Sequence, residues 1–264
     1  MADVKIKDQK LSASVEEVYK SLRTNLFFCG REKQVIAVTS CQTREGKSSV
    51  SLNLAMSLAE AQKKTIYIDA DLRNSTFLGK VSVSGERLGL AYYLSGLTES
   101  QDIICTTDHE NLDVIMTGRF PPNPAELLGR PELRELLEQL RLEYDYIIVD
   151  TPPVGSVIDC AIIAEACDGL IFVVEANSTS YRFAQQVKEQ LEKTSCPILG
   201  AILNKVDVTK QGYGRYGRYG RYGQYGQYGQ YGQYGQRTTK QGSKKKKGYA
   251  RYAKDFKNTN VREK

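Results

Sequence analysis

Residues 35–60 read VIAVTSCQTREGKSSVSLNLAMSLAE, an apolar β-branched run followed by a polar loop and an amphipathic segment. The run Val35–Thr39 predicts a strand, and SLNLAMSLAE has the apolar periodicity of a helix. Between them lies Gly46-Lys47-Ser48. A strand, a loop with this triplet and a helix form a P-loop, in which backbone N–H groups and the helix N-terminus bind phosphate. The segment therefore predicts a nucleotide-phosphate site.

The predicted nucleotide-binding residues of this loop are Thr43, Arg44, Glu45, Gly46, Lys47, Ser48 and Ser49. Lys47 would neutralise the β- and γ-phosphate oxygens, and the Ser48 hydroxyl would reach a bound Mg²⁺. Cys41 stands where a P-loop usually has its first glycine, so the pattern is incomplete. Because a GKS triplet can also be an exposed turn without function, other segments have to decide between the two interpretations.

Two acidic segments favour the phosphate site. One predicted strand ends in Asp69-Ala70-Asp71, and another ends in Ile147-Ile148-Val149-Asp150. Ligands bind at the carboxyl edge of open parallel sheets, which is where these carboxylates are expected to lie. Asp150 after an apolar strand is the expected Walker B carboxylate, a Mg²⁺ ligand. A helix cap or a solvated turn is the alternative for each acid alone, but the three segments in this order indicate a nucleotide site.

The apolar runs predict an α/β fold. Strands are expected at Val35–Thr39, Thr65–Asp69, Leu112–Met116, Tyr146–Asp150, Gly169–Glu175 and Gly200–Asn204. Several runs are apolar on both faces, which is typical of parallel strands covered by helices on both sides. The prediction is a three-layer sandwich with a mostly parallel central sheet, a P-loop NTPase fold with Walker A, A′ and B motifs.

Helix starts are also predicted. Ser14-x-x-Glu17 has the spacing of a capping box. The apolar stripe that follows is formed by Val15, Val18, Tyr19, Leu22 and Leu26. Asn123-Pro124 marks a second start, and Pro131 opens a third helix. That third helix is expected to turn Leu133, Leu136, Leu137 and Leu140 inward.

Composition excludes several classes of protein. The chain has 264 residues, of which 41% are hydrophobic and 26% charged, enough for a sizeable core. The start MADVKIKDQK lacks the apolar region of a secretory signal, and no apolar run is long enough for a membrane span, so a cytoplasmic protein is expected. The six cysteines form no C-x-x-C pair and are expected to be reduced thiols. His109 is the only histidine, which disfavours a Ser-His-Asp hydrolase or a histidine metal centre.

The C-terminal segment has a different composition. Residues 211–236 repeat tyrosine every third position between glycine, arginine and glutamine, and residues 244–247 are four lysines. Such a segment cannot build a core, so we expect one domain at 1–209 and a flexible tail at 210–264. Residues 1–209 have 22 Lys and Arg against 29 Asp and Glu, whereas the tail has 15 against 2. The tail holds ten of the 17 tyrosines: Tyr213, Tyr216, Tyr219, Tyr222, Tyr225, Tyr228, Tyr231, Tyr234, Tyr249 and Tyr252.

Taken together, the motifs resemble those of the bacterial tyrosine kinases of capsule and exopolysaccharide biosynthesis (the CpsD/CapB family, or BY-kinases). The matching segments are TSCQTREGKSSVSLNLA as Walker A, IYIDADLR as Walker A′, YDYIIVDTPP as Walker B and the intervening TGRFPPNPAELL. Glu17-x-x-Lys20-x-x-Arg23 resembles the family's E-x-x-R-x-x-R oligomerisation motif, with lysine in place of the first arginine. The resemblance covers about residues 14–209, and the tail shares the family's tyrosine-rich composition. Arg44 stands where the family often has glycine.

The resemblance implies a protein-tyrosine kinase that uses ATP and Mg²⁺. Lys47 would stabilise the phosphate charge, Ser48, Asp71 and Asp150 would organise Mg²⁺, and Asp69 would accept the tyrosine proton. The tail tyrosines would be phosphorylated in trans by another copy in a ring-like homo-oligomer, with Glu17, Lys20 and Arg23 at the interface. It also implies control of polysaccharide synthesis and export from the inner face of the plasma membrane, through a separate transmembrane adaptor.

The charges add a regulatory hypothesis. Residues 1–209 carry a net charge of −7 and the tail +13. Phosphorylation of all ten tail tyrosines would add about −15 to −20, because each phosphate adds about −1.5 to −2. The unmodified tail is therefore expected to bind the acidic domain or an anionic membrane surface, and phosphorylation to release it.

Three other functions stay open at this point. The partitioning and cell-division-positioning ATPases share this type of P-loop sheet, but Gln42 stands where they usually have a signature lysine. Asn204-Lys205-Val206-Asp207 matches the guanine-reading N-K-x-D pattern of GTPases. We assign Asn204 to the base pocket without a choice between adenine and guanine. The basic aromatic tail could bind nucleic acid by stacking and phosphate contacts, which we consider the weaker interpretation.

Overall fold

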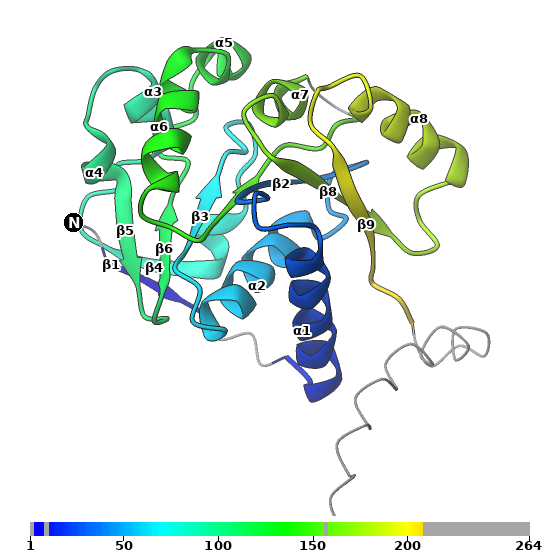
Figure 1. The fold of residues 1–264 in the computed structure, drawn as a ribbon. Helices are drawn as coiled ribbons and strands as arrows, with labels where there is room; N and C mark the ends of the chain where they lie inside the picture. The colour runs from blue at the N-terminus through cyan, green and yellow to red at the C-terminus, as the bar shows by residue number, and fades with distance from the viewer. Residues whose placement is uncertain (1–2, 8–10, 156–157, 208–264) are drawn as a thin grey trace, which may run out of the picture. The chain divides into compact units, whose positions relative to one another are not determined.

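The computed structural model describes residues 3–7, 11–155 and 158–207, and within them the strands form one sheet of order β4-β1-β5-β6-β3-β7-β2-β8-β9 (Figure 1). The strands are β1 (Asp3–Ile6), β2 (Val35–Ser40), β3 (Thr65–Asp69), β4 (Val81–Ser84), β5 (Ile104–Thr107), β6 (Leu112–Ile115), β7 (Tyr146–Asp150), β8 (Gly169–Glu175) and β9 (Ile198–Asn204). The helices are α1 (Ala13–Phe28), α2 (Lys47–Glu60), α3 (Leu90–Leu94), α4 (Ser100–Ile103), α5 (Pro124–Leu128), α6 (Pro131–Arg141), α7 (Asp159–Ala164), α8 (Tyr181–Leu191) and the 3₁₀ turn η1 (Phe77–Lys80).

The centre of the sheet is parallel, as the sequence predicts. Strands β2, β3 and β7 are buried along their whole length, and β7 pairs in parallel with both neighbours. The register sets Asp150 opposite Asp69 on one side and opposite Val38 on the other. Only the pairs β1–β4 and β5–β6 are antiparallel among the described strands. The carboxyl ends of three strands, two of which end in an aspartate, therefore meet at one edge.

Helices cover both faces, which confirms the three-layer α/β sandwich. Side chains of α1 and α2, such as Leu26 and Leu54, pack with Tyr67 and Ile148 on one face. The other face is covered by α3, α5, α6, α7 and α8, which lie above the sheet in Figure 1. The predicted inward residues of α6 are all buried: Leu133, Leu136, Leu137 and Leu140.

The predicted start of α1 is wrong. The N-cap is Ser12, and Ser14 lies inside the first turn, where its hydroxyl is 2.9 Å from that of Ser12. The predicted stripe is also only partly buried, because Val15 and Val18 are 39% and 63% exposed. Leu26 belongs to the core and Leu22 packs against it. The helix therefore contacts the core through its C-terminal half.

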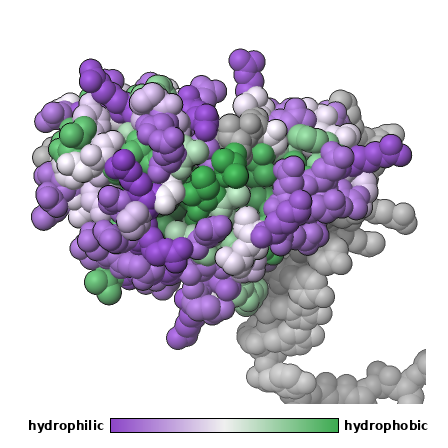
Figure 2. All heavy atoms as spheres, turned by 90° about the horizontal axis from the view of Figure 1, so that it is seen from above, coloured by the Kyte–Doolittle hydropathy of each residue, from purple (hydrophilic) through white to green (hydrophobic). Residues whose placement is uncertain are grey.

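The upper surface carries apolar side chains at its centre, between polar flanks (Figure 2). A groove of about 810 Å³ between α7 and α8 is lined by apolar residues such as Val154, Phe183 and Val187 together with the polar side chains of Gln186, Glu189, Gln190 and Lys193. No helix in the described part of the chain is both long enough and apolar enough to cross a membrane. The predicted tail at 210–264 and the domain boundary after Thr209 lie outside the described residues and stay predictions.

Far from the carboxyl edge, a charge pair joins α6 to the two strands that begin beside it. Asp168 accepts two hydrogen bonds from the Arg141 guanidinium, at 2.7 and 2.8 Å, and one each from the backbone N–H groups of Gln34 and Val35. Burial alone would raise the pKa of Asp168, but Arg141 and the N–H of Val35 outweigh it and lower that pKa below its ordinary value. The ionised carboxylate thus stabilises the fold.

We expect Asp168→Asn to lower the free energy of unfolding at neutral pH by about 2–3 kcal/mol, as for hydrogen bonds to a charged group. Because the folded-state pKa is depressed, this contribution exists above the ordinary aspartate pKa and is lost as pH falls through the folded-state value. Urea unfolding at a series of pH values measures it. Glu138→Gln, which changes only the exposed partner of Arg141, is the control and should shift stability by less than about 0.5 kcal/mol. A difference between Asp168→Asn and wild type that stays constant down to strong acid would contradict the assignment.

Candidate nucleotide and catalytic site

A cleft of about 610 Å³ opens at the carboxyl ends of β2, β3 and β7. Seven of its lining residues are predicted site residues: Thr43, Arg44, Gly46, Lys47, Ser48, Ser49 and Asp71. The others are Ser40, Gln42, Arg73, Asn74, Thr76, Pro152 and Pro153. The structure thus brings the Walker A loop together with the residues that follow β3 and β7, as the motif order predicts.

The loop backbone has two left-handed residues, Arg44 and Gly46. Gly46 precedes α2 with φ +90°, and a Cβ there would lie 2.2 Å from Nδ2 of Asn204. Glycine is therefore favoured by the backbone conformation, and a side chain here would also displace the Asn204 amide. Arg44 has φ +67°, a left-handed conformation that glycine adopts without strain and that is uncommon for other residues, so the arginine here is a less favourable choice than the glycine expected from the sequence resemblance. The loop leads directly into α2, whose N-terminal N–H groups have no side-chain cap.

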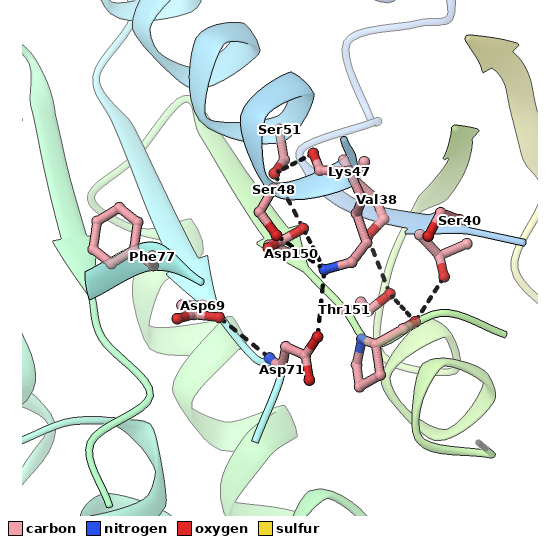
Figure 3. Close-up of polar contacts among 12 residues, drawn as sticks. Val38, Ser40, Lys47, Ser48, Ser51, Asp69, Asp71, Phe77, Asp150 and Thr151 are labelled. Carbon is pink, nitrogen blue, oxygen red and sulfur yellow. Dashed lines mark hydrogen bonds and ion pairs between the residues drawn. The ribbon is translucent and has the colours of Figure 1, made fainter. Parts of the chain in front are cut away.

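Lys47 lies between two buried carboxylates (Figure 3). Its Nζ is 3.0 Å from Oδ1 of Asp150 and 3.6 Å from Oδ2 of Asp71, and it also donates to the Ser48 hydroxyl at 3.2 Å. Burial alone would lower the pKa of Lys47, but the charges of Asp150 and Asp71 outweigh it and raise the pKa above its ordinary value. The ammonium group therefore stays charged and compensates the acids at the predicted metal position.

Asp69 occupies the buried end of β3. It accepts a hydrogen bond from the Ser75 hydroxyl and a longer one, 3.4 Å, from the N–H of Asp71. Burial raises the pKa of Asp69 to about 7, and the negative charge of Asp150 adds to this rise. A carboxyl that titrates near neutrality can take up and release a proton, as a general base must.

Two predicted nucleotide-binding residues support the loop from outside the cleft lining. The buried carboxylate of Glu45 accepts from the N–H of Gln42 at 2.8 Å and from the Thr179 hydroxyl. Asn204 Nδ2 donates to the carbonyl of Glu45 at 2.9 Å. The next residue, Lys205, donates to the carbonyl of Arg44 at 2.7 Å and pairs with Glu175 at 2.9 Å. The N-K-x-D segment thus holds the phosphate loop, and contact of Asn204 with a base stays a prediction.

The predicted interface residues lie on α1, away from the cleft lining. Glu17 and Lys20 form an exposed ion pair at 3.5 Å. Arg23 instead donates within the chain to the carbonyl of Ser57 on α2 and, at 3.3 Å, to its hydroxyl. Its guanidinium therefore joins the two helices. The predicted phosphoacceptor tyrosines all lie outside the described residues.

A strand, phosphate loop and helix beside buried aspartates at a parallel edge define a P-loop nucleotide-binding protein. A family model described as an AAA domain matches residues 33–198. The chain is 44% identical to tyrosine-protein kinase CpsD of Streptococcus agalactiae serotype III (strain NEM316) over 216 residues, 81% of this chain and 93% of CpsD. It is 34% identical to tyrosine-protein kinase YwqD of Bacillus subtilis (strain 168), covering 75% and 84% of the two chains.

A solved structure of a bacterial tyrosine kinase supports the same assignment. The kinase domain of the Escherichia coli tyrosine kinase ETK superposes with a TM-score of 0.70 at 34% identity, covering 74% of this chain and 77% of that one. The chain therefore belongs to the bacterial tyrosine-protein kinase family with a P-loop fold.

The support of the loop by Lys205 generates a prediction. Lys205→Met removes a charge-assisted hydrogen bond to the Arg44 carbonyl, so one of the contacts that hold the backbone of the phosphate loop in place is lost. We expect the Kd for ADP to rise about threefold to tenfold, since one such bond is worth about 1 kcal/mol. Titration of a fluorescent ADP analogue measures it. Lys188→Met, which breaks a comparable exposed ion pair on α8, is the control and should leave the Kd unchanged; equal affinities for all three proteins would refute the role of Lys205.

Proposed function

We propose that this protein is an ATP-dependent protein-tyrosine autokinase, which converts ATP and protein tyrosine into ADP and protein phosphotyrosine. The observation that carries the proposal is the position of Lys47 in the cleft, against Asp71 and Asp150, with Asp69 beside them on β3. Phosphoryl transfer requires positioning and charge stabilisation, which this set supplies without histidine. Membership of the tyrosine-protein kinase family supports the choice of tyrosine as acceptor.

The residues present fit Mg²⁺. The Ser48 hydroxyl and the carboxylates of Asp71 and Asp150 are oxygen donors, which Mg²⁺ prefers, and the Lys47 ammonium now lies among them. Among the described residues, no group of three or more His, Cys, Asp or Glu could hold a metal ion, so nucleotide phosphates would supply further ligands. When bound, Mg²⁺ would neutralise charge on the β- and γ-phosphates.

The chain's own groups then have distinct roles. The N–H groups of the loop and of the α2 N-terminus hold the phosphates, and Lys47 moves from the aspartates to the phosphate oxygens. The tyrosine hydroxyl oxygen forms a bond to the γ-phosphorus while the bond from that phosphorus to the β–γ bridging oxygen breaks. Asp69 accepts the phenolic proton, which a hydroxyl with a pKa near 10 does not release unaided.

We infer that the substrates are the tail tyrosines of another copy. Spaced three residues apart, they recur about every 10 Å in an extended chain, and a coil of this repeat spans roughly 27 Å. Many equivalent acceptors raise the local acceptor concentration. In this proposal the kinase acts at the inner face of the plasma membrane, where it regulates the synthesis and export of capsular polysaccharide or exopolysaccharide. Exposed Val18 and the Glu17–Lys20 pair on α1 support a homo-oligomer interface there.

We expect Lys47→Met and Asp150→Ala each to abolish phosphotyrosine formation, because one removes the phosphate-binding cation and the other a metal carboxylate. Mass spectrometry of the tail after incubation with ATP and Mg²⁺ measures the reaction, and circular dichroism verifies folding. Lys63→Met, which removes an exposed lysine of the α2–β3 turn, is the control.

Transfer in trans is tested by mixing two variants. The Lys47→Met chain serves as the phosphate acceptor. The phosphate donor is a full-length chain with an unchanged domain at 1–209, in which all ten tail tyrosines are replaced by phenylalanine. Phosphotyrosine on the acceptor is the expected result. Retained activity in both active-site variants would refute the site, whereas an unmodified acceptor would refute only the trans reaction.

The charge of the tail yields a further prediction. We propose that the unmodified tail, at +13, binds the acidic domain or anionic lipid at the membrane, beside a transmembrane adaptor that a separate chain supplies. Phosphorylation should therefore weaken co-sedimentation with phosphatidylserine vesicles and shift the oligomer distribution in analytical ultracentrifugation, with both effects reduced at high salt. Lys47→Met protein treated identically is the control. Identical vesicle binding and association state before and after phosphorylation would contradict the proposal.

A further inference from the structure

Tyr67 lies in an apolar environment in which phenylalanine would pack as well and would bury no hydroxyl. It is the third residue of β3, is fully buried, and its ring lies 5.0 Å from that of Phe77 among the aliphatic side chains under α2. A hydroxyl in such a core is costly unless it forms a hydrogen bond. The partner of this hydroxyl therefore indicates what the side chain does.

That partner is the Walker B carboxylate. Tyr67 Oη donates to Oδ2 of Asp150 at 3.2 Å. The register explains the reach, because Asp150 lies opposite Asp69, so Tyr67 is its diagonal neighbour two residues earlier on the same face. A phenol with an ordinary pKa near 10 is protonated at neutral pH, so Tyr67 is the donor in this bond.

The second oxygen of Asp150 has other partners. Oδ1 accepts from Lys47 Nζ at 3.0 Å, and the Ser51 hydroxyl lies 3.1 Å from this oxygen and 3.1 Å from the Lys47 carbonyl, so its one proton is shared between two acceptors. Ser51 comes from α2, whereas Tyr67 comes from β3, so hydroxyls from two separate elements contact the two oxygens, and Tyr67 is the one that donates to Asp150 alone. Of the three donors, Lys47 is the one that faces the cleft and is expected to leave for phosphate.

We propose that Tyr67 is a positioning residue that holds Oδ2 of Asp150, so that the carboxylate keeps its orientation and presents Oδ1 when Lys47 leaves. The proposal rests on the proposed function in one respect, the use of Asp150 toward a Mg²⁺–nucleotide complex. Hydrogen bonds to the ligand groups of a metal site commonly change metal affinity by about 10- to 100-fold. The hydroxyl of Tyr67 would act on metal affinity, not on the phosphate loop.

Tyr67→Phe tests the proposal, because it removes one oxygen and keeps the ring. The measurement is binding of a fluorescent ADP analogue, titrated with Mg²⁺ and repeated in EDTA. We expect the Mg²⁺ concentration for half-maximal enhancement of binding to rise about tenfold, with affinity in EDTA within about twofold of wild type. Excess Mg²⁺ should restore binding. Circular dichroism and thermal unfolding verify that the variant is folded.

Tyr144→Phe is the matched control. Tyr144 donates to Asp113 at 2.7 Å, so the change also removes a phenol–carboxylate hydrogen bond, but before β7 and away from the cleft lining. Its Mg²⁺ titration should equal that of wild type. A Tyr67→Phe titration equal to wild type, or equal weakening with Mg²⁺ and in EDTA, would overturn the positioning role while nucleotide binding stands. A wild-type chain whose ADP binding does not respond to Mg²⁺ would overturn the proposed metal site and this inference with it.

Discussion

The site depends on the compensation of buried negative charge by Lys47. Asp69, Asp71 and Asp150 are all buried at one sheet edge, and three ionised carboxylates there would repel one another in a medium that solvates them poorly. The Lys47 ammonium contacts two of them, and the rise in the pKa of Asp69 to about 7 lessens the negative charge further. The same lysine begins α2, so the helix, the loop and the strand ends are tied to a single cation.

The central strands could be predicted because each is long enough to be apolar on both faces. Strands β1, β4 and β5 could not, since each is a run of four residues with only two apolar side chains, as in β1, where exposed Asp3 and Lys5 alternate with buried Val4 and Ile6. Such segments become strands through pairing with distant residues, as β1 does with β4 and β5. The start of α1 was misplaced because two nearby serines, Ser12 and Ser14, are both good N-caps and only the structure shows which is used.

The site was predictable where a motif fixes spacing, and less so where tertiary contact decides. Six of the seven predicted loop residues and Asp71 line the cleft, whereas Glu45, Asp69 and Asp150 do not. Asn74, Thr76 and Pro153 enter the lining through loop geometry that no sequence periodicity indicates. Glu45 was assigned to the nucleotide from its place in the loop, yet its carboxylate is buried against Gln42 and Thr179. Tyr67 lies in an apolar strand and carries no local signal of its bond to Asp150.

The ion pairs of Lys47 also affect the free energy of nucleotide binding. The Lys47 ammonium already has oxygens of Asp150, Asp71 and Ser48 around its three N–H donors, so a phosphate that Lys47 contacts would replace at least one of these partners. This exchange costs little free energy only if the carboxylates that Lys47 leaves bind another cation, such as Mg²⁺, and keep their orientation. Tyr67 holds Asp150 through an uncharged donor on β3, and this hydrogen bond does not depend on the position of the lysine side chain. The orientation of Asp150 therefore depends on a hydroxyl donor of the sheet, whereas the positive charge that moves on nucleotide binding belongs to the flexible Lys47 side chain.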